Sequence, residues 1–176
     1  IEKMPKTADE FKALDLNGRT VEENITEMVG KTGEKMELAH FEVISAPRVF
    51  AYNHPGNRLA TILGLSKTGI EGIEQAGHEV AMQIAAMAPV AVDKDDVPSD
   101  VIEREIEIGK EQARQEGKPE EMVEKIAVGK LNKFYKENTL LNQEFVRDNK
   151  LSVREYLTKL DKELTVKSFK RFMLGA

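Results

Sequence analysis

The sequence predicts an α+β fold: a small antiparallel sheet of three to four strands, covered by helices and interrupted by an inserted antiparallel helical hairpin. Three observations predict it. Helix-capping patterns recur along the chain, strand-like apolar patterns occupy two separate regions, and the densely charged middle carries thin apolar stripes at helical spacing. Aliphatic residues are common, whereas aromatic residues make up only 6% of the 176 residues, which favours helices around a modest core.

Two short helices are expected at the beginning of the chain, over residues 6–14 and 18–30. Gly30 is typical of the position that ends a helix. Each helix begins with the spacing of a capping box, in which a threonine caps the first turn and a glutamate three places on bonds back to it. These pairs are Thr7 with Glu10 and Thr20 with Glu23.

Residues 34–66 are expected to form a three-stranded antiparallel meander. The first strand, 34–45, alternates apolar and polar residues with a slip near His40 that suggests a bulge. The second and third, 48–52 and 58–66, are rich in β-forming residues and flank the turn sequence NHPGN.

Four further elements complete the sheet-and-helix body. Residues 69–89 predict a helix that is apolar nearly all round before Pro89 ends it, so it is buried on several sides or offers one side to a partner. Extended structure is expected over 142–148. A capped helix over 152–163 then leads into a late strand over 164–175, which rejoins the sheet.

The charged middle of the chain predicts a helical hairpin. Helices over 99–116 and 119–137 are separated by Gly117 and Pro119, the residues that respectively end one helix and start the next. Each helix carries one narrow apolar stripe, so the two can pack as a short antiparallel coiled coil that projects from the body. The stripes are Ile102, Ile106, Gly109 and Ala113 on the first, and Val123, Ile126, Ala127, Leu131 and Phe134 on the second.

Composition excludes several classes of function. The chain has no cysteine, which excludes disulfides, thiol nucleophiles and zinc–thiolate sites. A net charge of −5 argues against nucleic acid as a direct partner, because phosphates reward a basic surface. No apolar run is long enough to suggest a membrane span and no signal-peptide pattern opens the chain, so a cytoplasmic protein without membrane contact is expected.

The sequence contains no group of residues whose types and spacing match a known catalytic arrangement. Three histidines stand at spacings that match no common metal site, so no metal and no cofactor are expected. An enzyme using His54 with Glu42 or Asp93 is kept as an alternative, although only the presence of these residues supports it. A second alternative is a stand-alone interaction domain whose coiled coil binds other partners.

Several segments, in order, resemble the C-terminal part of the bacterial elongation factor Ts family. They are GKTGEKMEL (30–38), YNHPGNR (52–58), AMQIAAMAP (81–89), DDVP (95–98), SVREYL (152–157), FKRFMLG (169–175) and, most specifically, GKPEEMVEKIAVGKLNKFYKENTLLNQEFVRD (117–148). The resemblance covers roughly residues 18–176.

The resemblance implies a guanine-nucleotide exchange factor of protein biosynthesis, which is not an enzyme in its own right. Such a factor binds elongation factor Tu, in its GDP-bound and nucleotide-free forms, and promotes GDP release. In the family a Thr-Asp-Phe-Val segment supplies a phenylalanine wedge near the nucleotide-bound magnesium. Here TADEF (7–11) echoes it only superficially, and the chain starts at Ile1. A fragment that supplies docking without the wedge is therefore expected.

The resemblance also suggests a domain division and an interface. Residues 1–30 would be a helical remnant of the preceding subdomain, 31–97 with 141–176 the α+β core, and 98–140 the coiled-coil insertion. Self-association is a further possible interaction. The docking candidates lie in the 52–58 turn and on the exposed side of the helix at 82–89, where methionine can repack against a partner. They are His54, Gly56, Arg58, Met82 and Met87.

Overall fold

The computed structural model describes residues 4–175 and divides the chain into two units, residues 1–43 and 44–176. The first unit contains α1 (Ala8–Lys12) and α2 (Val21–Thr32). Thr20 caps α2 and Glu23 bonds back to the Thr20 N–H at 2.7 Å, so the predicted capping box is confirmed. At the start of α1 the Thr7 hydroxyl accepts from the Glu10 N–H at 3.1 Å.

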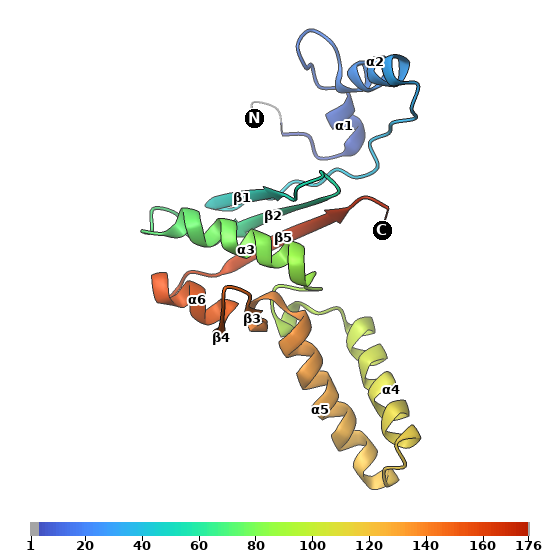
Figure 1. The fold of residues 1–176 in the computed structure, drawn as a ribbon, viewed down its shortest axis with the longest axis vertical. Helices are drawn as coiled ribbons and strands as arrows, with labels where there is room; N and C mark the ends of the chain where they lie inside the picture. Colours follow the sequence, from blue (N-terminus) through green and yellow to red (C-terminus); the bar gives the residue numbers. More distant parts are fainter. Residues whose placement is uncertain (1–3, 176) are drawn as a thin grey trace. The chain divides into compact units, whose positions relative to one another are not determined.

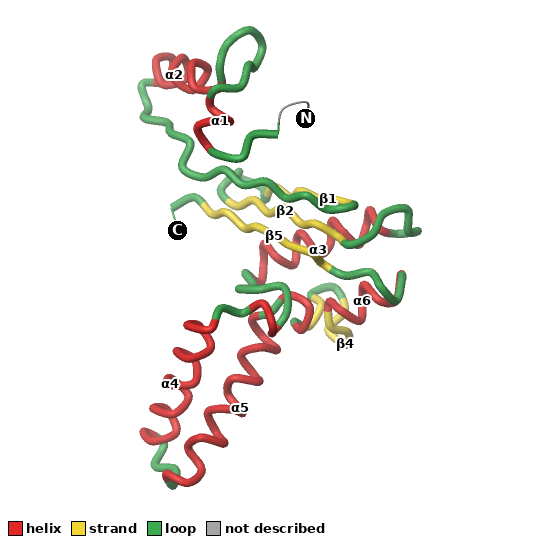
Figure 2. Tube along the Cα trace, turned by 180° about the vertical axis from the view of Figure 1, so that it is seen from behind, coloured by secondary structure: helices red, strands yellow, loops and turns green. Residues whose placement is uncertain are grey.

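The second unit is built on a three-stranded antiparallel sheet of order β1-β2-β5, so the predicted α+β fold with a small antiparallel sheet is confirmed (Figures 1 and 2). The central strand is β2 (Leu59–Leu65), and Leu63 pairs with Phe50 on one side and Phe169 on the other. A separate two-stranded sheet contains β3 (Glu144–Phe145) and β4 (Asp148–Ser152). The outer strands are β1 (Arg48–Asn53) and β5 (Val166–Met173).

The prediction of a first strand over residues 34–45 was wrong. This segment has no regular strand, and β5 takes the place of the third strand in the sheet. Ile44 and Ala46 instead pack over Gly64, where a Cβ would lie only 2.8 Å from the Ala46 Cβ. Within this segment Phe41 stacks on Phe11 and Ile44 packs over Gly64, whereas Met36 and Val43 are exposed, so its alternation of apolar residues does not reflect strand pairing.

Helix α3 (Ile73–Met87) crosses one face of the sheet (Figure 1). Its N-terminal half passes close to Phe50: a Cβ on Gly77 would lie 2.2 to 2.4 Å from the Phe50 ring. On its other side lies α6 (Val153–Leu160), which begins with the predicted box of Ser152 and Glu155. The core between these layers is apolar and includes Leu63, Leu65, Val80, Ile84 and Leu157, each fully buried.

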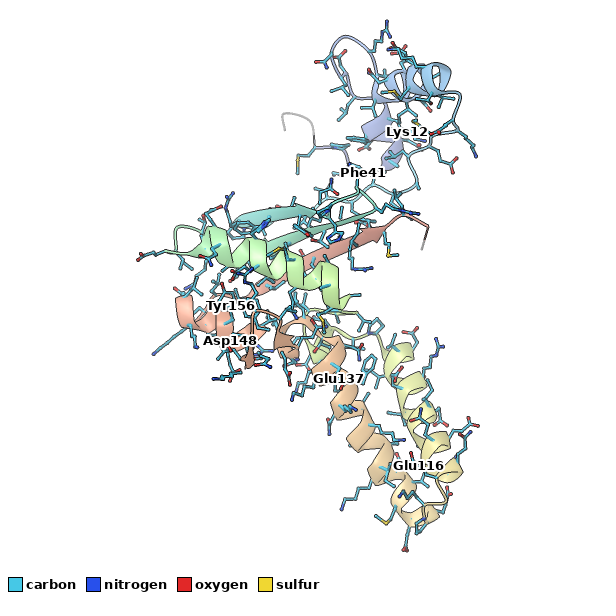
Figure 3. All side chains as sticks on the ribbon, viewed as in Figure 1. Lys12, Phe41, Glu116, Glu137, Asp148 and Tyr156 are labelled. Carbon is cyan, nitrogen blue, oxygen red and sulfur yellow. The ribbon has the colours of Figure 1, made fainter. Side chains whose placement is uncertain are left out.

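The predicted hairpin is formed by α4 (Ser99–Gln115) and α5 (Glu120–Asn138), inserted between β2 and β5. The arms project from the body, with Glu137 near the root and Glu116 near the tip (Figure 3). Gly109, Ala113, Val123 and Ala127 are buried along the seam, as the stripes predict. The backbones approach most closely at Gly109, where a Cβ would lie 3.1 Å from the Ala127 Cα. No helix among the described residues is both long and apolar enough to cross a bilayer.

The root of the hairpin is bonded to the segment that follows α3. The N–H of Val90 donates to Asn138 O, that of Leu140 to Ala91 O, and that of Leu141 to Val92 O, at 2.9 to 3.0 Å. Two short 3₁₀ turns, Lys94–Asp96 and Leu140–Asn142, flank this contact.

The Asp93 carboxylate completes the root. It accepts from Arg154 at 2.5 Å and from Asn142 at 2.8 Å. Burial raises the pKa of Asp93, but these hydrogen bonds outweigh it and keep the pKa below its usual value.

Candidate protein-docking site

A groove of about 420 Å³ lies along α3 in the second unit. One wall comes from the end of β1, the following turn and the start of β2; the other comes from the two-residue turn between β3 and β4. The helix lies between the two walls. The lining residues are Tyr52, His54, Leu59, Glu79, Met82, Gln83, Ala85, Ala86, Phe145, Val146 and Arg147.

The first wall is shaped by the turn between β1 and β2. His54 N donates to Leu59 O at 2.8 Å, which closes the turn, and Gly56 has a φ of 93°, a conformation that favours glycine. Tyr52 and His54 are joined by a hydrogen bond of 2.9 Å between the tyrosine hydroxyl and Nδ1. The Tyr52 ring also packs edge-on against His78 of α3, which joins this wall to the helix.

The second wall is fixed to α3 by Gln83. The Gln83 side chain is buried; its Nε2 donates to Glu144 O at 3.1 Å and its Oε1 accepts from Val146 N at 2.9 Å. Nε2 also donates to the Gln143 Oε1 at 3.1 Å. Both ends of this side chain are therefore used to hold the β3–β4 turn, and Gln83 has a structural role.

Phe145 and Tyr156 pack beneath the β3–β4 turn, on the side that faces α6. Phe145 is buried and stacks on Tyr156 of α6 with ring centroids 4.1 Å apart. The Tyr156 hydroxyl donates to Glu79 at 2.5 Å. Burial raises the pKa of Tyr156, and the neighbouring Glu79 carboxylate raises it further. The hydroxyl therefore stays protonated and remains a donor.

Glu79 is the charged residue at the centre of the site. It is only 8% exposed and also contacts Arg147, whose Nε lies 3.3 Å from Oε1. Burial raises the pKa of Glu79, but the hydrogen bonds from Tyr156 and Gln75 and the charge of Arg147 outweigh it, so the pKa is lowered. The carboxylate is therefore ionised and held inside the protein.

The structure brings only some of the predicted docking residues together. His54 and Met82 line the same groove, from the first wall and from α3. Gly56 and Arg58 are exposed on the adjoining turn, outside the lining. Met87 is exposed at a separate hollow of about 180 Å³ near the hairpin root, with Lys136 and Glu144. As an interface, all five remain a prediction.

The second wall was missed by the sequence analysis. Phe145, Val146 and Arg147 lie in QEFVRD, where only extended structure was expected. An apolar residue followed by a cation at a turn between short strands was the one available signal. Nothing local to this segment indicates that it packs on a helix some 60 residues earlier in the chain.

For the alternative of a catalytic His54, the described structure does not place Asp93 as a hydrogen-bond partner of that histidine. Its Nδ1 is hydrogen-bonded to Tyr52, and Asp93 is held by Arg154 and Asn142. Within residues 4–175 no cluster of three or more acidic or histidine side chains could hold a metal ion.

The groove is concave and mostly apolar, which is typical of binding sites. The whole chain, residues 1–176, matches the model of the family described as Elongation factor TS. It is 53% identical over 172 residues to Elongation factor Ts of Amoebophilus asiaticus, covering 98% of this chain and 62% of the relative. The chain belongs to the elongation factor Ts family.

Two other relatives agree. Elongation factor Ts of Cytophaga hutchinsonii is 52% identical over 176 residues, covering 99% of this chain and 63% of the relative. That of Porphyromonas gingivalis is 48% identical over 178 residues, covering 100% and 64%. The chain thus spans a little under two thirds of the length of these relatives.

Proposed function

We propose that this chain is the docking part of a guanine-nucleotide exchange factor, which binds elongation factor Tu and, within the whole factor, promotes GDP release. The observation that carries the proposal is the match of the entire chain to the elongation factor Ts family. The groove supports it, because a preformed apolar surface can bind a protein without any chemical step. The five predicted residues, His54, Gly56, Arg58, Met82 and Met87, are proposed contacts.

Thermodynamic linkage defines what docking can and cannot do. An exchange factor that binds the nucleotide-free GTPase more tightly than the nucleotide-bound form must weaken the binding of nucleotide to the same extent. Binding that is equally favourable to the empty and loaded forms shifts nothing. Exchange therefore needs a contact that distinguishes the two forms, in addition to a surface that holds the partner.

The local structure of the TADEF segment supports a division of labour in which that contact comes from elsewhere in the factor. Thr7 caps α1, and the Phe11 ring stacks on Phe41 of the same unit with centroids 4.8 Å apart. Phe11 is therefore packed within the first unit. We propose that these 176 residues hold the partner and that nucleotide displacement needs a further segment of the factor.

Two measurements test this function. Calorimetry of the chain with elongation factor Tu, GDP-bound and nucleotide-free, should show weak binding to both forms. Stopped-flow release of a fluorescent GDP should show no acceleration by this chain, whereas a chain extended to the full length of the relatives should accelerate release. Strong acceleration by the 176 residues alone would contradict the division of labour, and no binding to either form would contradict docking.

A further inference from the structure

The groove along α3 has the chemistry of a receptor for a bulky apolar side chain. Leu59, Met82, Ala86 and Val146 line it, and Met82 is half-buried, so it can repack around an occupant. A volume of about 420 Å³ lies at the small end of the range of about 300–1,000 Å³ for ligand clefts. It suits one or two side chains of a protein partner.

The more exposed member of the ion pair at the groove is the cation, Arg147. The carboxylate of Glu79 is almost wholly buried, whereas the Arg147 side chain is 61% exposed although its Nε contacts Glu79. A guanidinium carries five N–H donors, so a second carboxylate can bind it from outside.

The groove is also preformed. Gln83 fixes the backbone of the β3–β4 turn at two points, and Phe145 beneath that turn is buried and stacked on Tyr156. Arg147 is thereby held beside the apolar lining, which lowers the cost of ordering the site when a partner binds.

We propose that this groove is the docking site for elongation factor Tu and that it receives a segment of one stated chemistry: a bulky apolar side chain with an Asp or Glu within one helical turn. The apolar group packs on Met82 and Ala86, and the carboxylate pairs with Arg147. The proposal rests on the proposed function and adds the site and the chemistry of the partner's segment.

Three variants test the site. Ala86→Trp fills the groove from an exposed position of α3, and Val146→Asp places a carboxylate where the partner's acid would lie. Val128→Asp is the matched control, since Val128 of α5 is 47% exposed and outside the groove, against 58% for Val146. In calorimetry with elongation factor Tu, the first two should bind about tenfold more weakly or worse, and the control should bind within about twofold of wild type.

The charge is tested at Arg147 with a readout that packing alone does not move. Arg147→Gln should weaken binding and flatten its dependence on salt concentration, because the lost pair is screened by ions. Arg147→Glu should weaken binding further. Thermal melts of each variant verify that the body remains folded.

The segment itself is identified by crosslinking. Benzoylphenylalanine in place of Val146 should crosslink to a partner peptide with a bulky apolar residue and an adjacent acid. If wild type binds elongation factor Tu and the groove variants bind equally well, or if the crosslinked peptide is basic, the groove proposal is overturned while docking stands. If wild type does not bind elongation factor Tu at all, the proposed function itself fails.

Discussion

Helix α3 buries its side chains against β1, β2 and α6, whereas α4 and α5 bury theirs mainly against each other. The difference is visible in the side chains. In α3 apolar residues fill most of the circumference and even Gln83 is buried. The hairpin arms bury only small residues along one seam and expose their charges. The main hydrophobic core therefore lies in the body, and the hairpin has a separate seam of its own.

The ion pairs of the hairpin do not change this conclusion. Lys110 with Glu124 and Lys130 with Glu116 cross between the arms at 3.2 and 3.3 Å, and both glutamates are more than half exposed. Exposed pairs contribute little to stability because water and salt screen them.

Two helical glycines offer the largest expected contrast. In α3, Gly77→Ala pushes a methyl group into the Phe50 ring and should destabilise the protein by about 2 kcal/mol, although alanine favours helix. In α5, Gly129→Ala meets nothing within 4 Å and should stabilise by about 0.8 kcal/mol. Urea denaturation of both variants measures the difference. Equal effects of the same sign would show that α3 is not tightly packed on β1.

The next effect concerns charge and depends on pH. Glu79→Gln should cost about 1.5 kcal/mol at pH 7, because hydrogen bonds to an ionised group are the stronger ones. The folded pKa of Glu79 lies below its unfolded value of about 4.3. Its stabilisation is therefore complete above that value and is lost as the pH falls through the folded pKa.

Urea denaturation from pH 7 down to about pH 3 checks this behaviour, and the difference from wild type should shrink below about pH 4.3. Glu74→Gln is the control on the same helix: Glu74 pairs with Arg48 at 2.5 Å but is 68% exposed, so no measurable change is expected. A difference at Glu79 that stayed constant with pH would mean that the carboxylate is not ionised in the folded protein.

Replacing the hairpin should have the smallest effect on the body. We propose that residues 98–140 form a separable insertion, and the segments at its root run parallel, so a Gly-Ser linker of about 12 residues can replace 99–137. The melting temperature of the body should change little, because the core cluster contains no residue of α4 or α5. Loss of cooperative unfolding would show that the arms are part of the core.

Local patterns predicted much of this fold because their causes are local. The box of Ser152 and Glu155 closes within one turn, and the stripes of the hairpin follow helical spacing, so each can be identified without knowledge of the fold. The prediction of a strand over 34–45 was wrong for the opposite reason. Its apolar residues contact distant positions such as Gly64, and periodicity does not distinguish such contacts from strand pairing.

The candidate site was half predictable. The NHPGN turn and the apolar end of α3 stand out in the sequence, and they supply His54 and Met82. The opposite wall depends on the bond between Gln83 and the Val146 backbone, which joins residues 63 positions apart. Neither partner carries a local signal for that bond, so the groove emerges only from the fold.

The bonded root makes the hairpin a lever. At about 1.5 Å per residue, the 19-residue α5 is about 28 Å long, and Asn138 and Leu140 at its base are tied to Val90 and Ala91. A sideways force at the tip becomes a torque on the strand of chain that leaves α3. A macromolecule that binds the far end of the hairpin would therefore load the segment that directly follows α3.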